Sequence, residues 1–111
     1  MELAHTIVNA LEDKKGENIL LLDIKKLTSF TDYFIICTAT SSRMLNALVD
    51  GVTEKTHAKH KKKGRIEGSP EAGWMVVDYG DIVVHLFDEE LRQYYRLEEL
   101  WKDGKVLLRV Q

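Results

Sequence analysis

The stretch GWMVVDYGDIVVHLF, Gly73–Phe87, contains two short apolar runs on either side of the dipeptide Gly80–Asp81. This dipeptide is favoured in two-residue hairpin turns, because glycine accepts a positive φ and aspartate tolerates one. We therefore predict a β-hairpin whose turn fixes the pairing of its strands. The predicted pairs are Tyr79 with Ile82, Asp78 with Val83, Val77 with Val84, Val76 with His85, Met75 with Leu86 and Trp74 with Phe87.

Side chains alternate between the two faces of a strand, so this register sorts the hairpin into two faces of different character. One face is apolar apart from a phenol and is expected to point into the core: Met75, Val77, Tyr79, Ile82, Val84 and Leu86. The other face mixes aromatic and aliphatic groups with one acid and one imidazole: Trp74, Val76, Asp78, Val83, His85 and Phe87.

Two interpretations of this second face remain open. It resembles a recognition surface, since large rigid rings contribute strongly to binding and a few polar groups fix orientation. Alternatively, it is a second packed layer in which a helix covers Trp74 and Phe87, while Asp78 and His85 find partners inside the protein.

The chain before the hairpin predicts a helix, two strands and a second helix. Apolar residues recur at helical spacing from Leu3 to Leu11, and Gly16 follows where a helix would end. Residues 18–24 and 32–40 are short apolar runs typical of strands in a covered sheet. Ser41 or Ser42 is the predicted N-cap of a helix that runs to about Lys61.

Residues 61–73 hold three glycines, the only proline and mixed charges, so we predict a loop there. After the hairpin, Asp88 is the predicted cap of a last helix, with a break near Arg96. The tail from Lys105 either adds an edge strand or is loosely held. The predicted class is α+β: a small mixed β-sheet with helices packed on it, in the order helix, strand, strand, helix, strand, strand, helix.

Length and charge narrow the class of protein. The chain has 111 residues and a formal net charge of −2, which fits one domain over residues 1–111 and gives no overall attraction to nucleic acid or anionic membrane. The single Cys37 cannot form an intramolecular disulfide, which suits a reducing compartment. No apolar run of signal-peptide or membrane-span length begins the chain, so we expect a cytoplasmic protein without membrane contact.

Motifs for catalysis and cofactor binding are weak. Asp78 and Asp81 are three apart across a turn and do not alternate on one strand face, while His57 and His60 lie in a basic stretch that repels cations. No phosphate-binding loop or dinucleotide fingerprint occurs. We expect no enzyme activity, no small-molecule substrate, no metal and no cofactor.

A cluster of cations follows the second helix: Lys59, Lys61, Lys62, Lys63 and Arg65. It has no interleaved aromatic residues on which bases would stack. We interpret it first as a solvated helix end and second as a peripheral contact with the phosphate backbone of RNA.

Three motifs together resemble the ribosomal silencing factor family, also called Iojap-like proteins. They are TDYFIICTATSSR (31–43), IEG followed by GWMVVDYGDIVVHLF (66–87), and YYRLEELW (94–101). The resemblance covers nearly the whole chain. It implies a nucleotidyltransferase-like fold without a working catalytic site, in a cytoplasmic protein that is usually a homodimer.

The resemblance also implies a function. Such proteins bind the universal large-subunit ribosomal protein numbered fourteen, uL-fourteen, and sterically block joining of the small and large subunits when nutrients are scarce. Some members are linked to large-subunit assembly. An alternative from another class is residual nucleotide binding or nucleotidyl transfer through Ser41, Ser42, Asp78 and Asp81.

The family motif positions in this chain are Asp32, Tyr33, Ser41, Ser42, Arg43, Glu67, Gly68, Trp74, Asp78, Tyr79, Gly80, Asp81, His85, Tyr95, Leu97, Glu98 and Trp101. Ala39 and Tyr94 depart from the common pattern, which has glycine and phenylalanine there. From the hairpin face and these motifs together, the candidate partner-binding residues are Trp74, Val76, Asp78, Tyr79, Val83, His85, Phe87 and Tyr95. Leu97 and Trp101 are assigned to core or dimer packing.

Overall fold

The computed structural model describes residues 2–96, 99 and 101–110. Its elements are α1 (Glu2–Asp13), β1 (Glu17–Asp23), β2 (Tyr33–Ala39), α2 (Ser42–His60), β3 (Arg65–Ser69), β4 (Trp74–Asp78), β5 (Ile82–Asp88), α3 (Glu89–Tyr95) and β6 (Lys105–Val110).

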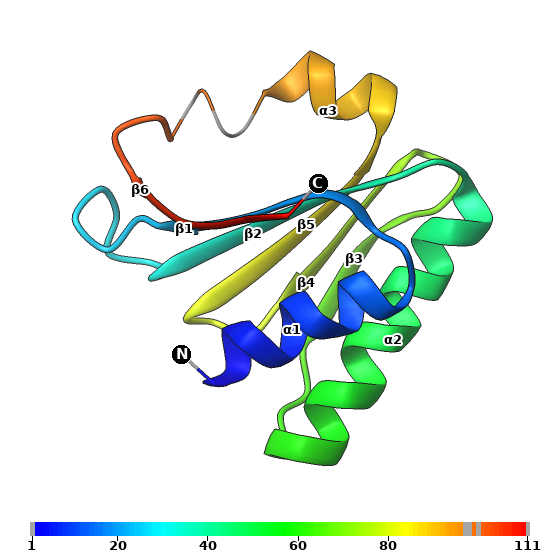
Figure 1. Ribbon diagram of the computed structural model, residues 1–111, viewed down its shortest axis with the longest axis horizontal. Helices are drawn as coiled ribbons and strands as arrows, with labels where there is room; N and C mark the ends of the chain where they lie inside the picture. The colour runs from blue at the N-terminus through cyan, green and yellow to red at the C-terminus, as the bar shows by residue number, and fades with distance from the viewer. Residues whose placement is uncertain (1, 97–98, 100, 111) are drawn as a thin grey trace.

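The strands form one six-stranded mixed sheet in the order β3-β4-β5-β2-β1-β6 (Figure 1). Only β2 and β5 are parallel, and the other four neighbouring pairs are antiparallel. The predicted α+β class with a mixed sheet is confirmed. Of the two alternatives for the C-terminal tail, the structure shows the edge strand, since β6 pairs with β1.

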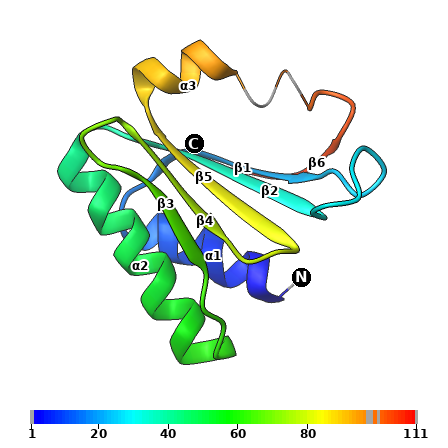
Figure 2. The same ribbon diagram turned by 180° about the vertical axis from the view of Figure 1, so that it is seen from behind.

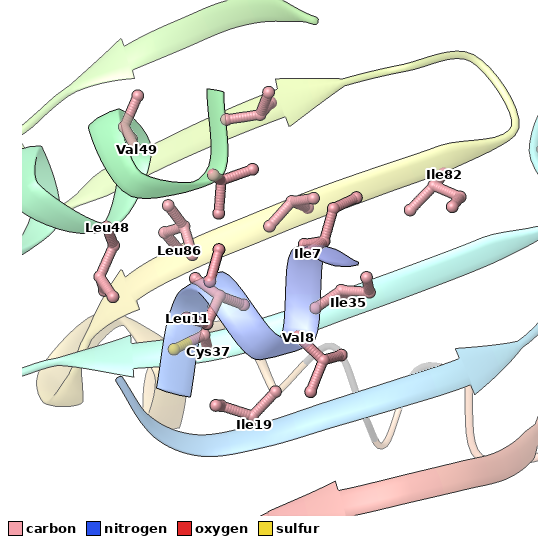
Figure 3. Close-up of a cluster of buried hydrophobic side chains, with 14 of the residues drawn as sticks. Ile7, Val8, Leu11, Ile19, Ile35, Cys37, Leu48, Val49, Ile82 and Leu86 are labelled. Carbon is pink, nitrogen blue, oxygen red and sulfur yellow. The ribbon is translucent and has the colours of Figure 1, made fainter. Parts of the chain in front are cut away.

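The helices lie on opposite faces of the sheet. Figures 1 and 2 show α1 and α2 side by side on one face and α3 on the other. The main core fills the space beneath α1 and α2, where Ile7, Leu11, Ile35, Leu48 and Leu86 are at most 1% exposed (Figure 3). No helix in the described part of the chain is long and apolar enough to cross a membrane.

Cys37 belongs to this core and is fully buried. Burial raises the pKa of its thiol to about 12, because a thiolate loses its hydration there. The thiol is therefore protonated at neutral pH and does not supply a nucleophile.

A smaller apolar cluster lies on the α3 face of the sheet. It contains Leu20, Leu22, Ile24, Phe34, Ile36 and Phe87, with Trp74, Val83, Leu91 and Trp101 packed at its margin. Trp101 meets Phe34 edge to face, with ring centroids 5.3 Å apart. This face of the central strands is thus covered in part by the segment that follows β5.

The hairpin has the predicted register. Trp74 is opposite Phe87, Val76 opposite His85 and Asp78 opposite Val83, and the Tyr79 N–H donates to the Ile82 carbonyl at 2.9 Å. Gly80 has φ +90°, a backbone conformation that residues with a Cβ rarely adopt. The turn therefore selects which side chains reach each face.

The predicted loop over residues 61–73 is wrong in part, because residues 65–69 form the edge strand β3. Most of its side chains are exposed, including Ile66 at 48%, so the strand has no buried face that would produce a period of two. Its stability comes from backbone pairing with β4, which its own sequence does not encode.

The helix boundaries follow the predicted capping residues. Ser41 accepts from the Met44 N–H at 3.1 Å and Asp88 from the Leu91 N–H at 2.8 Å. Arg96 has a left-handed φ of 48° and ends α3, which agrees with the predicted break. Leu97 and Glu98, which belong to the family motif, and Leu100 lie outside the described residues.

Candidate docking surface

The outer faces of β3, β4 and β5 form a grid of side chains. Pairing aligns three rows across these strands: Arg65, Asp78 and Val83; Glu67, Val76 and His85; Ser69, Trp74 and Phe87. Arg65 and Glu67 are exposed, while Trp74, Asp78 and His85 are half-buried. The grid is therefore exposed on β3 and partly covered on β4 and β5, where Val76 and Phe87 are buried.

A pocket of about 510 Å³ opens at the end of this grid where Ser69, Trp74 and Phe87 form a row. The last helix contributes Leu91 and Tyr95, and Tyr95 stacks on Phe87 with ring centroids 6.0 Å apart. The complete lining is Ala72, Trp74, His85, Phe87, Leu91 and Tyr95. Aromatic and aliphatic groups dominate this wall, which suits an inserted apolar side chain.

Local backbone geometry holds the pocket together. The Asp88 N–H donates to the Gly73 carbonyl at 2.9 Å, and the Asp88 carboxylate caps α3. A Cβ on Gly73 would lie 2.2 Å from Asp88 Oδ2, and the φ of Gly73 is +78°. Glycine at this position lets Trp74 and α3 approach each other across the pocket.

The His85 imidazole lies between two aromatic rings. Its centroid is 4.7 Å from that of Phe34, edge to face, and 6.2 Å from that of Phe87, nearly parallel. Nε2 is buried without a hydrogen-bond partner among the described residues. Burial lowers the pKa of His85 to about 4, an effect that the Asp78 carboxylate partly opposes, so the imidazole is neutral at pH 7.

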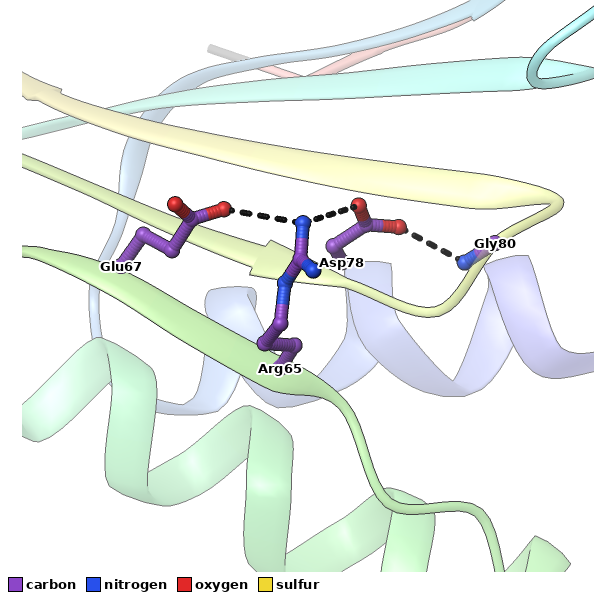
Figure 4. Close-up of polar contacts among 4 residues, drawn as sticks. All are labelled: Arg65, Glu67, Asp78 and Gly80. Atoms are coloured by element: carbon purple, nitrogen blue, oxygen red, sulfur yellow. Dashed lines mark hydrogen bonds and ion pairs between the residues drawn. The ribbon is translucent and has the colours of Figure 1, made fainter.

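Glu67 and Asp78 form an acidic pair near the opposite, more exposed end of the grid (Figure 4). Asp78 Oδ1 accepts from the Gly80 N–H at 2.8 Å, which fixes the carboxylate beside the turn. Arg65 Nη2 lies 3.3 Å from Glu67 Oε2 and 3.7 Å from Asp78 Oδ2. One guanidinium thus contacts both carboxylates.

The structure distributes the candidate partner-binding residues unevenly. Trp74, Asp78, Val83, His85 and Tyr95 are at least partly accessible on the outer side, with Tyr95 51% exposed. Val76 and Phe87 face the same side but are only 7% and 3% exposed, respectively, so they support their neighbours. The packed-layer interpretation therefore holds for Val76 and Phe87, and recognition by the accessible residues stays a prediction.

Tyr79 requires a correction, because it lies on the opposite face within the main core. It is 9% exposed, and its hydroxyl shares a hydrogen bond of 2.7 Å with Thr56 on α2. The alternating register puts Tyr79 with the core residues Val77 and Met75. We leave it out of the contact surface.

The cationic cluster separates into two groups. Lys59 lies in the last turn of α2, and Lys61, Lys62 and Lys63 lie between α2 and β3, all exposed. These four ammonium groups have no ion-pair partner within the described part of the chain. Arg65 instead belongs to the sheet face with Asp78.

The residues of the nucleotide-binding alternative do not come together. Ser41 follows the C-terminal end of β2, where Ala39 pairs with Asp88, whereas Asp81 precedes β5 and contacts the N-terminal end of β2 through Tyr33. A strand of this length separates the two sites by about 20 Å. In the described residues no cluster of three or more His, Cys, Asp or Glu side chains is arranged to hold a metal.

Two pocket residues, Ala72 and Leu91, were not predicted as site residues. Leu91 could have been predicted from the sequence, because it precedes Tyr95 by four residues and so lies on the same face of the helix. Ala72 carries no chemical signal, and its place in the pocket depends on the turn between β3 and β4.

Comparisons with known proteins agree on one family. The family model described as "Ribosomal silencing factor during starvation" matches residues 1–110. A ribosomal silencing factor of Halalkalibacterium halodurans is 36% identical over 93% of this chain and 88% of its own. A crystal structure of a Chromobacterium violaceum protein superposes with a TM-score of 0.86 at 35% identity, covering 99% of this chain and 91% of that one.

A mouse relative carries a different name, "Mitochondrial assembly of ribosomal large subunit protein 1". It is 34% identical over 86% of this chain, which corresponds to 43% of the mouse protein.

The fold and the site define an α+β domain with a partly open sheet face that carries an apolar pocket and an acidic pair. The family match extends over almost all of this domain. The chain belongs to the ribosomal silencing factor family.

Proposed function

We propose that this protein represses translation by steric exclusion and catalyses no reaction. It binds the large ribosomal subunit through uL-fourteen under nutrient limitation, and its bulk then prevents the small subunit from joining. The observation that supports this proposal most is the combination of a half-buried Trp74 at an apolar pocket with a turn-anchored Asp78 on the same open face.

This combination has the physical properties of a protein-binding surface. An indole at a pocket edge loses much water-exposed area when a partner covers it, and its rigidity limits the entropy lost. Asp78 and Glu67 add negative charge, which favours the Lys- and Arg-rich surface of a ribosomal protein. The partner therefore supplies an apolar side chain for the pocket and cationic groups for the acidic pair.

The family resemblance further supports a cytoplasmic homodimer. The name of the mouse relative favours a second candidate function, assembly of the large subunit. The two functions differ in the particle that the protein binds: silencing acts on mature subunits, whereas an assembly factor acts on immature particles.

Subunit joining tests the leading proposal directly. Purified large subunits are incubated with the protein, small subunits are added, and the products are separated by sedimentation. We expect fewer joined ribosomes and more free subunits, with the protein in the large-subunit peak. Normal joining at a protein concentration that saturates the mature large subunit would contradict silencing, and binding confined to immature particles would favour assembly.

The lysines of residues 59–63 are proposed to contact rRNA phosphates at the edge of this interface. Each phosphate contact releases counterions, so replacing Lys61, Lys62 and Lys63 with glutamine should reduce the slope of log affinity against log salt by about 2–3. Replacing the exposed Lys15, Lys26 and Lys105 changes the net charge equally and serves as the control. An equal reduction of the slope in both variants would contradict a local contact.

A further inference from the structure

We propose that Arg65 shields the acidic pair Glu67–Asp78 in the free protein and is displaced when a cationic side chain of the partner binds there. Arg65 would then limit affinity and select partners with enough positive charge to replace it. This inference rests on the proposed function, because it concerns the same docking face.

Arg65 lies where a cation of the partner would bind, because its guanidinium contacts both carboxylates of the acidic pair. It lies directly opposite Asp78 in the pairing of β3 with β4, and Glu67 follows two residues later on the same face. The Arg65 guanidinium approaches both carboxylates through a single nitrogen, at 3.3 and 3.7 Å (Figure 4). It therefore compensates one of the two negative charges at the site where a cationic partner would bind.

These ion pairs are weak enough to exchange. The side chains of Arg65 and Glu67 are 73% and 53% exposed, respectively, and exposed pairs of this kind contribute little to stability. Neither contact is the two-pronged arrangement that makes an arginine–carboxylate pair strong. A partner cation can therefore replace Arg65 at a small cost in free energy.

Asp78 does not depend on Arg65 for its position. The Gly80 N–H holds Oδ1 at 2.8 Å, and the side chain is only 31% exposed. When the guanidinium leaves, this carboxylate remains oriented toward the open face. The site is thus preorganised for a cation whether or not Arg65 occupies it.

The distance between Trp74 and Asp78 also indicates which groups a partner must present. Trp74 and Asp78 are four residues apart on β4, which corresponds to about 13 Å along an extended strand. A suitable partner presents an apolar side chain to the pocket and a lysine or arginine about this distance away. A partner with the apolar group alone would leave Arg65 in place.

The test is to measure the affinity of Arg65→Gln for purified large subunits at low salt. We expect binding to become about two- to fivefold tighter, mainly through faster association, because the variant presents both carboxylates uncompensated. Adding Glu67→Gln to this variant should remove most of the gain. The control is Lys105→Gln on the opposite sheet edge, which makes the same charge change and should leave affinity nearly unchanged.

Trp74→Ala, measured in parallel, separates this inference from the proposed docking face. If Trp74→Ala weakens binding while Arg65→Gln is neutral or weakens it too, Arg65 is not a displaced shield, although the face still docks. If Trp74→Ala and Arg65→Gln both leave binding unchanged, the docking face and the shield are both wrong. If Arg65→Gln and Lys105→Gln increase the affinity equally, the gain reflects net charge alone, and Arg65 is not a displaced shield.

Discussion

Replacement of Trp74 with alanine should weaken binding to the large ribosomal subunit by about 2 kcal/mol or more, which corresponds to roughly a 30-fold higher Kd. The indole is half-buried at the pocket edge, between the exposed β3 and the covered β5. A partner that inserts a side chain beside it would complete its burial. Truncation removes that contact area and leaves the inserted group partly solvated.

The measurement is titration of labelled large subunits with each variant, combined with urea unfolding to show that Trp74→Ala remains folded. Phe30→Ala is a matched control, because Phe30 is also aromatic and is 67% exposed, but it lies in the loop between β1 and β2. It should bind like the wild type. An unchanged affinity for a folded Trp74→Ala variant would remove the indole from the interface.

Local signals in the sequence account for the elements that were predicted correctly. The Gly80–Asp81 turn fixes the hairpin register, and that register determines which residues face α1 and α2. The caps Ser41 and Asp88 likewise act within a few residues of their own position. Such features depend on short-range chemistry, so a single sequence reveals them.

Features that depend on distant partners were not predictable in the same way. β3 is a strand because β4 offers it a hydrogen-bonding edge, although its own composition is that of a loop. The cover over the second sheet face depends on where α3 and Trp101 pack. The candidate site was therefore predicted as a set of side chains, but its division into an open acidic end and an apolar pocket was not.

The surface on which each residue of the cationic cluster lies was also not predictable from the sequence. Along the sequence, Arg65 continues the lysine run that starts at Lys59. In the structure, pairing of β3 with β4 turns Arg65 toward Asp78, while Lys61, Lys62 and Lys63 stay in the preceding connection. A contiguous charge run is thus divided between two surfaces by the start of a strand.

Acidification from pH 7 to pH 4 should lower the free energy of unfolding through His85 by up to about 3 kcal/mol. Burial beside Phe34 and Phe87 lowers the pKa of this imidazole from 6.5 to about 4, and the nearby Asp78 only partly opposes the shift. Between these values the unfolded chain binds a proton that the folded chain excludes. Stability from this group is therefore complete above pH 6.5 and is lost as the pH falls toward 4, at about 1.4 kcal/mol per unit.

His85→Leu removes this titration and keeps an apolar group between the two rings. Urea unfolding at pH 7, 5.5 and 4 should show that the variant loses less stability than the wild type on acidification, with the difference developing between pH 6.5 and 4. His57→Gln is the control for removing one histidine from the chain, since His57 is exposed on α2. Parallel curves for His85→Leu and the wild type would show that the imidazole is protonated as easily in the folded protein as in the unfolded chain. The face would then carry a positive charge near pH 6, which would disfavour a cationic partner beside Asp78, so this experiment also tests the electrostatic basis of the docking surface.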